Sequence, residues 1–159
     1  MDSVLDLRMV AYGDPDAVAL VARVQEEYVE RYGSPDETPL DPDMFDPPEG
    51  LFLVAYLDGV PVGTGAWRHT PVLALGGSLA AEIKRMYVVP EHRGTGLARR
   101  ILAELENTAV AAGHDLIVLE TGLMQPEAIA LYESSGYLPI AGFGHYADSE
   151  LNRCFAKRV

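Results

Sequence analysis

The sequence has little cysteine and little positive charge. Cys154 is the only cysteine in 159 residues, which excludes an intramolecular disulfide and a metal site built from several cysteines. We expect it to be a buried strand residue. Lys and Arg number 12 against 24 Asp and Glu, and the net charge of -12 would repel the phosphates of nucleic acids and anionic lipids. Nucleic acid is therefore not expected as a partner.

Long apolar segments are missing as well. The longest uninterrupted apolar run, 51–57, is far shorter than the roughly 20 residues that a bilayer-spanning helix requires. The chain begins MDSVLD, with acidic residues where a signal peptide would have a basic segment leading into an apolar one. We therefore expect a soluble, cytoplasmic protein without membrane association. With 48% hydrophobic residues, residues 1–159 are expected to form a single domain.

The four histidines do not have the spacing of a metal site, and we expect no metal. The few cations are unevenly distributed, because five of the twelve lie within seventeen positions: Lys84, Arg85, Arg93, Arg99 and Arg100. This clustering favours either a local anion site or an ordinary exposed helix face.

Hydrophobic periodicity predicts alternating strands and helices. We expect strands at 5–11, 51–57, 62–68, 83–89, 115–120, 137–143 and 151–159, and helices at about 17–32, 95–112 and 125–135. Asp58-Gly59 is typical of a tight hairpin turn. Segment 34–50, with five prolines and six acids, is interpreted as a solvated connector, the alternative being a lid over an acceptor. This order predicts an α/β (α+β) fold with a mixed sheet covered by helices.

The segment Arg93-Gly94-Thr95-Gly96-Leu97-Ala98 directly follows a predicted strand and opens a helix. Small residues allow close approach of a ligand, and the first helical N–H groups point outward with the positive end of the helix dipole. A pyrophosphate fits such a turn, and Arg93, Arg99 and Arg100 could add charge to it. The Rossmann fingerprint needs a small residue at Arg99, and the P-loop needs Gly-Lys-Ser/Thr, which this chain lacks.

The stretch from Met86 to Ala98 resembles motif A of the GNAT (Gcn5-related N-acetyltransferase) superfamily, including its Arg/Gln-x-x-Gly-x-Gly/Ala signature. Downstream, the stretch from Gln125 to Tyr137 is similar to the family's motif B. The two motifs stand in the family's order and spacing. The resemblance implies the GNAT fold, with a mixed, mostly antiparallel sheet of about six to seven strands flanked by about four helices. It also implies acetyl-CoA as the donor.

The resemblance further implies which residues contact the cosubstrate. Strand residues Met86, Tyr87 and Val88 would border it, with backbone groups of Met86 and Val88 pairing with the pantetheine arm. Gln125 stands where many members have Asn and keeps the same donor and acceptor groups. The pyrophosphate would lie in the turn formed by Arg93, Gly94, Thr95, Gly96, Leu97, Ala98 and Arg99.

The implied reaction is direct attack of an amine on the thioester. Tyr132 matches the family's frequent general acid. A base is needed because an alkyl amine with a pKa near 10.4 is almost fully protonated at pH 7. Glu82 resembles the glutamate position of the family's histone acetyltransferases, and strand alternation predicts that it shares a face with Met86 and Val88. Glu120, which we prefer, resembles the position in its ribosomal-protein N-terminal acetyltransferases.

The acceptor is the least determined part of this hypothesis. The acids between Asp36 and Asp46 favour a cationic amine, whereas Arg68, His69 or Arg85 would suit an acceptor carboxylate. We expect a small-molecule amine such as an amino acid, polyamine or antibiotic-like amine. The alternatives are a protein N-terminus or lysine and, in another class, an acyl-CoA-binding sensor without catalysis. The resemblance also allows a homodimer.

Overall fold

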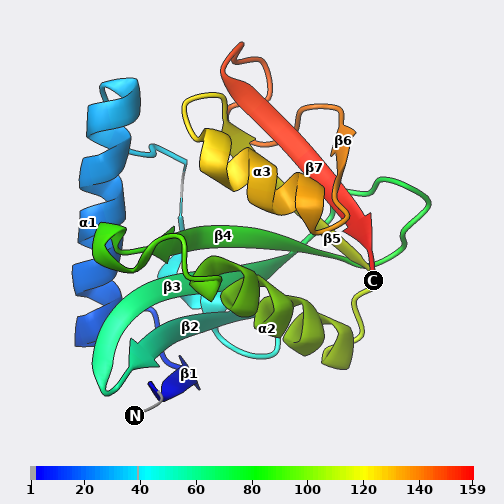
Figure 1. The fold of residues 1–159 in the computed structure, drawn as a ribbon. Coiled ribbons are helices and arrows are strands. Elements are labelled where there is room, and N and C mark those ends of the chain that lie inside the picture. The colour runs from blue at the N-terminus through cyan, green and yellow to red at the C-terminus, as the bar shows by residue number, and fades with distance from the viewer. Residues whose placement is uncertain (1–2, 39) are drawn as a thin grey trace.

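The computed structural model describes residues 3–38 and 40–159. Met1 and Asp2, part of the argument against export, lie outside the described residues, as does Pro39 of segment 34–50. Seven strands form one sheet in the order β1-β2-β3-β4-β5-β7-β6 (Figure 1). The strands are β1 (Leu5–Met9), β2 (Gly50–Leu57), β3 (Val60–Thr70), β4 (Ala80–Val88), β5 (Leu116–Gly122), β6 (Leu138–Ile140) and β7 (Asn152–Arg158).

Only β4 and β5 are parallel neighbours, and every other pair in the sheet is antiparallel. The predicted mixed, mostly antiparallel sheet is therefore confirmed. The described residues contain three α-helices where about four helices were expected: α1 (Pro15–Tyr32), α2 (Leu97–Ala111) and α3 (Pro126–Ser134). Two short 3-10 helices, Pro42–Phe45 and Pro90–His92, accompany them. The strand predicted at 137–143 is only three residues long.

Local sequence accounts for several element ends. The Asp14 carboxylate accepts hydrogen bonds from the backbone N–H groups of Asp16 and Ala17 and so begins α1. Gly33, with φ of 84°, ends that helix in the left-handed conformation. Asp58 and Gly59, both with positive φ, form the predicted hairpin turn between β2 and β3.

Helix α2 packs directly on β3 (Figure 1). A Cβ added at Gly65 would overlap with Ile101 and Leu105 of α2, so glycine is what permits this close approach. A Cβ at Gly63 would overlap with the Tyr87 carbonyl oxygen and lie only 3.0 Å from Ile101. On the same face the Trp67 indole donates a hydrogen bond to the Thr108 hydroxyl at 3.0 Å. Burial of large apolar side chains in this layer stabilises the fold by about 1.5–3 kcal/mol each.

A β-bulge interrupts β4 and overturns the predicted strand alternation. Ala66 pairs with Lys84 but Thr64 pairs with Tyr87, so two residues of β4 stand opposite Gly65, and one of them, Arg85, has φ of 56°. Because of the extra residue, Met86 lies on the α2 side with Gly65.

Glu82 lies on the other face, since it pairs with Arg68, the neighbour of the α2-facing Trp67. The prediction that Glu82 shares a face with Met86 and Val88 was therefore wrong. Within residues 3–38 and 40–159, no helix is long and apolar enough to cross a membrane.

Candidate active site

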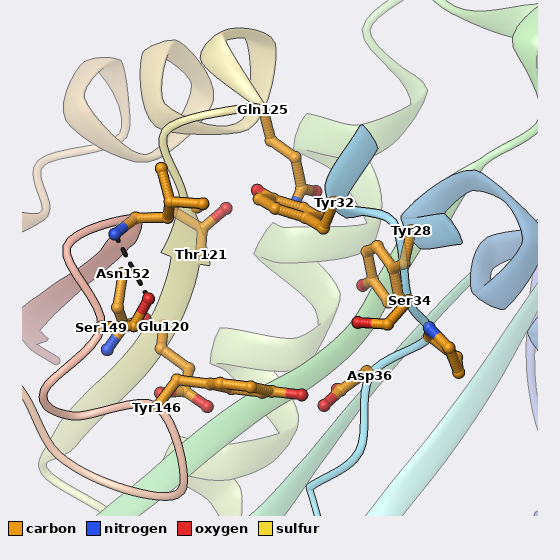
Figure 2. A pocket seen from close by; sticks show the side chains of 13 residues that line it. Tyr28, Tyr32, Ser34, Asp36, Glu120, Thr121, Gln125, Tyr146, Ser149 and Asn152 are labelled. Carbon is orange, nitrogen blue, oxygen red and sulfur yellow. Dashed lines mark hydrogen bonds between the residues drawn. The ribbon is translucent and has the colours of Figure 1, made fainter. Parts of the chain in front are cut away.

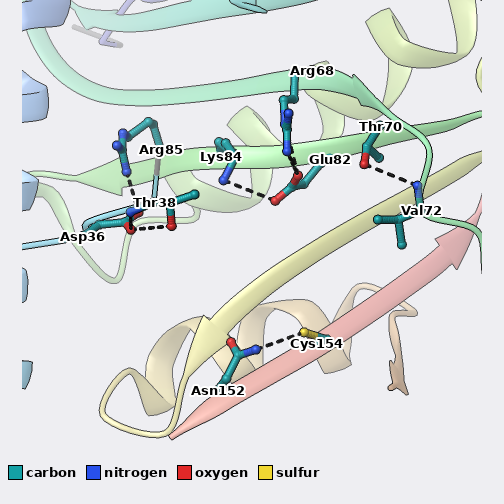
Figure 3. A network of polar contacts seen from close by, with 10 residues as sticks. All are labelled: Asp36, Thr38, Arg68, Thr70, Val72, Glu82, Lys84, Arg85, Asn152 and Cys154. Carbon is teal, nitrogen blue, oxygen red and sulfur yellow. Dashed lines mark hydrogen bonds and ion pairs between the residues drawn. The ribbon is translucent and has the colours of Figure 1, made fainter. Parts of the chain in front are cut away.

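Strands β4 and β5 pair only at their first residues and then separate. Their register comprises Ala80 with Leu116, Ala81 with Ile117, and Glu82 with Val118. Beyond these pairs β4 continues to Val88 beside β3, and β5 continues to Gly122 beside β7. Figure 3 shows the two strands diverging. The divergence opens the sheet at the carboxyl ends of two parallel strands.

A cavity of about 340 Å³ lies at this opening. Its walls are the second half of β4, the turn that precedes α2, the end of β5 and the first turns of α3. Ten of the eleven residues expected to contact the cosubstrate line it: Met86, Tyr87, Val88, Arg93, Gly94, Gly96, Leu97, Ala98, Arg99 and Gln125. The structure thus brings both sequence motifs to one cavity, and we refer to it as the donor cavity.

The N-terminus of α2 in this cavity is built to receive an anion. Gly94 and Gly96 have φ of 77° and 83°, and a Cβ at either would meet no atom within 4 Å. Their backbone is therefore open to a ligand. No side chain among the described residues caps this helix, and its first turn holds no acid. In α1, by contrast, Asp14 occupies the first N–H groups. The free N–H groups and the helix dipole of α2 fit a phosphate.

The arginines near this turn differ in their roles. The Arg93 side chain points back into the protein, where it pairs with Glu27 at 2.8 Å and donates to the Val88 carbonyl at 2.8 Å. Arg99 lines the cavity and donates to the hydroxyls of Ser134 and Ser135 beyond it. Arg100 is exposed and is not a lining residue.

Thr95, the remaining predicted cosubstrate residue, is not a lining residue either, because its hydroxyl donates to the His92 carbonyl at 2.8 Å and closes the turn. The sequence had suggested charge from three arginines. In this conformation only Arg99 presents a side chain at the cavity without an acidic partner among the described residues.

A second cavity, of about 250 Å³, adjoins the first. Figure 2 shows the side chains that line it. Its walls come from the end of α1, segment 34–36, the end of β5 and the connection between β6 and β7. Tyr28, Glu120, Thr121 and Gln125 line both cavities. The two therefore meet at Glu120, and we refer to the second as the acceptor cavity. Asp36 lines it, which is evidence against the interpretation of segment 34–50 as only a solvated connector.

Glu120 has the environment of a general base. Its Oε2 atom is buried and has no hydrogen-bond partner among the described residues. Burial, together with the nearby charge of Glu82, raises the pKa of this carboxyl from its ordinary 4.5 to about 7, against the opposing effect of Lys84. A carboxylate with a pKa near the working pH, at the junction of two cavities, is suited to accept a proton.

Glu82 is placed differently, although sequence analysis proposed it for the same role. It is buried and ion-paired with Arg68 at 3.0 Å and with Lys84 at 3.2 Å (Figure 3). It lines neither the donor nor the acceptor cavity. Of the two candidate bases, only Glu120 lines the cavities and can reach a ligand there. Glu82 influences the site through its charge, which raises the pKa of Glu120.

Tyr132 lines the donor cavity from α3 and is 5% exposed. Its ring packs edge-on against Tyr137, with centroids 5.7 Å apart, and is tilted against Phe155. Burial raises the pKa of the Tyr132 phenol, so the group stays protonated throughout the physiological range. The phenol is therefore protonated and held in one place by its neighbours.

The acceptor-cavity tyrosines were not singled out as site residues from the sequence. Tyr28 and Tyr32 lie within the helix expected at about 17–32, at a helical spacing that is equally typical of core positions. That four-residue spacing was the available signal, since it places both on one face at the end of α1. Tyr146 comes from the turn between β6 and β7, and no local pattern could associate it with α1.

Two smaller expectations concern cysteine and metal. Cys154 is a buried residue of β7, as expected, and it lines neither of the two cavities. Among residues 3–38 and 40–159, no group of three or more His, Cys, Asp or Glu side chains is arranged to hold a metal ion.

Comparisons with known proteins agree with this geometry. Residues 20–137 match the family model described as the acetyltransferase (GNAT) family. An IAA acetyltransferase of Azospirillum brasilense is 36% identical over 138 residues, which cover 86% of this chain and 87% of that protein.

Two solved structures resemble the whole chain. A protein of Klebsiella pneumoniae, assigned as an acyl-CoA N-acyltransferase, has a TM-score of 0.75 at 31% identity, covering 98% of this chain and 97% of its own. A GNAT acetyltransferase of Elizabethkingia anophelis with acetyl-CoA bound has a TM-score of 0.68 at 13% identity, covering 98% of each chain. The second likeness concerns the fold alone.

Proposed function

This chain belongs to the GNAT acetyltransferase family and is an N-acetyltransferase, and we propose that it transfers the acetyl group of acetyl-CoA directly to the amine of a small molecule. The observation that carries the proposal is the meeting of two cavities at Glu120, one at a helix N-terminus suited to phosphate and one of about 250 Å³. The acceptor cavity is below the 300–1,000 Å³ typical of sites for drug-sized ligands. Such a volume suits a small acceptor.

Acetyl-CoA supplies the activated acetyl group as a thioester, and the chain supplies its binding groups. The free N–H groups of the first turn of α2, with Arg99 beside them, hold the pyrophosphate. Met86 and Val88, on the part of β4 that has separated from β5, offer backbone groups to the pantetheine arm. Gln125 lines both cavities and donates to the Tyr32 hydroxyl at 3.2 Å, so it links the donor side to the acceptor side.

Glu120 acts as the base in this proposal. An alkyl ammonium in the acceptor cavity has a pKa near 10.4 in water and must lose a proton before its nitrogen can attack. Glu120, with a pKa of about 7, is about half ionised at pH 7 and mostly ionised at higher pH, and it lines both cavities. It takes up this proton, and the neutral nitrogen then attacks the thioester carbonyl.

Two further groups act on the thioester: one stabilises the negative charge that develops on its oxygen, and the other protonates the departing sulfur. A backbone N–H at the Val88 end of β4 stabilises negative charge on the thioester oxygen. Tyr132, protonated and lining the donor cavity, gives a proton to the leaving sulfur, and the second proton that the nitrogen loses as the amide forms restores the phenol. The raised pKa of Tyr132 makes this transfer uphill, so the phenol would act together with cleavage of the C–S bond. Cys154 lies outside both cavities, in keeping with transfer that forms no acetyl-enzyme.

The experiment is a thiol-release assay with acetyl-CoA and a broad panel of amines, alongside calorimetric titration of coenzyme A. Turnover with small amines and micromolar binding of coenzyme A support the proposal. Turnover only with peptide N-termini or lysine side chains would replace the small molecule by a protein. Tight binding without turnover on any amine would point to an acyl-CoA sensor and end the proposal.

A further inference from the structure

The acceptor cavity is acidic and has no cation in its lining. Asp36 and Glu120 are its two acids, and none of the thirteen lining residues is Lys, Arg or His. An ammonium group is stabilised by such carboxylates, whereas an anionic group on the acceptor would meet like charge without a partner. The negative charge of the lining residues therefore restricts the choice of acceptor more than the volume of the cavity does.

The cations near the cavity are already held by carboxylates. Arg85 Nη1 donates to Asp36 Oδ2 at 2.9 Å (Figure 3). Arg85 lines the donor cavity and not the acceptor cavity, and its Nε atom is buried without a hydrogen-bond partner among the described residues. Arg68 and Lys84 both pair with Glu82. His69 is exposed beside His114, with ring centroids 5.7 Å apart, and is not a lining residue. Of the three residues that the sequence suggested for an acceptor carboxylate, Arg68 and Arg85 are paired with carboxylates of the protein, and His69 lies outside the acceptor cavity.

The Asp36–Arg85 pair is fixed in place by other contacts. The Asp36 carboxylate also accepts from the Thr38 backbone N–H and hydroxyl, and these bonds and Arg85 lower the pKa of Asp36 against the effect of burial. The Gln25 side chain exchanges two hydrogen bonds with the Asp36 backbone. Asp36 therefore stays ionised and keeps the Arg85 guanidinium from the acceptor.

The remaining walls are aromatic and neutral. Tyr28, Tyr32 and Tyr146 line the cavity from α1 and from the β6–β7 connection (Figure 2). Their hydroxyls are partly occupied, since Tyr32 accepts from Gln125 and Tyr146 accepts from the Glu37 backbone N–H. Aromatic rings attract both apolar bodies and ammonium groups.

We propose that the acceptor is a primary amine with an aromatic or aliphatic body and no carboxylate, and that the Asp36–Arg85 pair enforces the exclusion of carboxylates. The inference rests on the proposed function, because it describes the acceptor of the same reaction. It departs from the amino acid that the sequence left among the candidates, since an amino acid would place its carboxylate beside Asp36 and Glu120.

The test compares amines that differ only by a carboxylate: tyramine with tyrosine, phenethylamine with phenylalanine, and tryptamine with tryptophan. We expect kcat/KM at least 100-fold higher for the amine in each pair that turns over. Equal values, or faster turnover of the amino acids, would overturn the inference and leave the N-acetyltransferase proposal intact. Absence of turnover with every amine, with coenzyme A still bound, would end both.

The variant Asp36→Asn examines the pair itself. Loss of the carboxylate frees Arg85, so the ratio of kcat/KM for tyramine over tyrosine is expected to fall at least tenfold. Asp43→Asn, an exposed acid of the same segment, is the matched control and should keep the wild-type ratio. An unchanged ratio in Asp36→Asn, with a wild-type melting curve, would refute the role of the pair. The amine panel on the wild-type protein stands even if this variant fails to fold.

Discussion

Replacing Glu120 by Gln removes the proposed base with little change in the shape of the side chain. The effect on kcat/KM should depend on pH in a way that tests whether Glu120 is the base. In the proposed mechanism, ionised Glu120 of the wild type accepts the proton of a bound ammonium. With the pKa of Glu120 at about 7, kcat/KM should rise tenfold per pH unit below 7. It should then stay level until the ammonium itself loses its proton near pH 10.

The Gln variant can use only amine that is already neutral. With a pKa of 10.4, that fraction is about 1 in 2,500 at pH 7 and about 1 in 25 at pH 9. The variant's kcat/KM should therefore rise about 100-fold over this interval, while the wild type, half ionised at pH 7, gains about twofold. At pH 7 the kcat/KM of the variant should be lower than that of the wild type by a factor on the order of 10³. At pH 9 this factor should be about 50-fold smaller.

The assay is thiol release at subsaturating amine between pH 6 and 10, with Glu26→Gln, an exposed carboxylate of α1, as the matched control. The control should follow the wild-type profile. The assignment of Glu120 as the base would be refuted if kcat/KM of Glu120→Gln stayed level above pH 7, as in the wild type, and were less than tenfold below the wild-type value at pH 7. The base would then have to be another group, such as Glu82 or a water molecule.

Four further predictions address the acid, the turn, the acceptor wall and stability. Tyr132→Phe should lower kcat about 100-fold and leave the coenzyme A Kd unchanged by calorimetry; equal kcat would exclude this phenol. Gly96→Ala forces φ near 83° on alanine, costing about 1–2 kcal/mol, and should weaken coenzyme A binding about tenfold relative to a Gly13→Ala control. In Gly122→Ala the methyl overlaps with the Tyr32 hydroxyl, which should raise the amine KM and spare coenzyme A affinity. Glu120→Gln should also be more stable than the wild type at pH 8, but not at pH 4, in urea denaturation.

The sign of the stability effect follows from the direction of the pKa shift. The folded state holds the Glu120 proton more tightly than the unfolded chain, whose carboxyl has the ordinary pKa of 4.5. The folded protein therefore loses stability as the pH rises from about 4.5 to about 7. At about 1.4 kcal/mol per unit of pKa shift, the upper limit is about 3 kcal/mol. A Gln variant that is less stable than the wild type at pH 8 would contradict the shift.

Local sequence patterns were sufficient for much of the fold and for the donor side of the site. The capping aspartate and terminal glycine of α1, the Asp58-Gly59 turn and the glycine turn before α2 depend on near neighbours in the chain. Ten of the eleven predicted cosubstrate residues line one cavity because they belong to two contiguous segments. Residues that are close in sequence can be recognised without knowledge of the rest of the chain.

Other features were decided only by tertiary structure. The bulge at Arg85 arises from pairing with β3, and it reversed the faces assigned to Glu82 and Met86 by simple alternation. The choice between Glu82 and Glu120 depended on which carboxylate the packing buries beneath two cations and which it exposes to the cavities. Neither environment is visible in the strand on which each glutamate lies.

The amino-acid sequence alone determined the order of the elements, the glycine turn before α2 and the family, because backbone conformation and helix ends respond to residues within a few positions. The acceptor cavity, the raised pKa of Glu120 and the pairing of Asp36 with Arg85 required the folded chain. These depend on burial and on charges brought together from distant segments. Electrostatic energies follow distance in space and the exclusion of water, which separation along the chain does not determine.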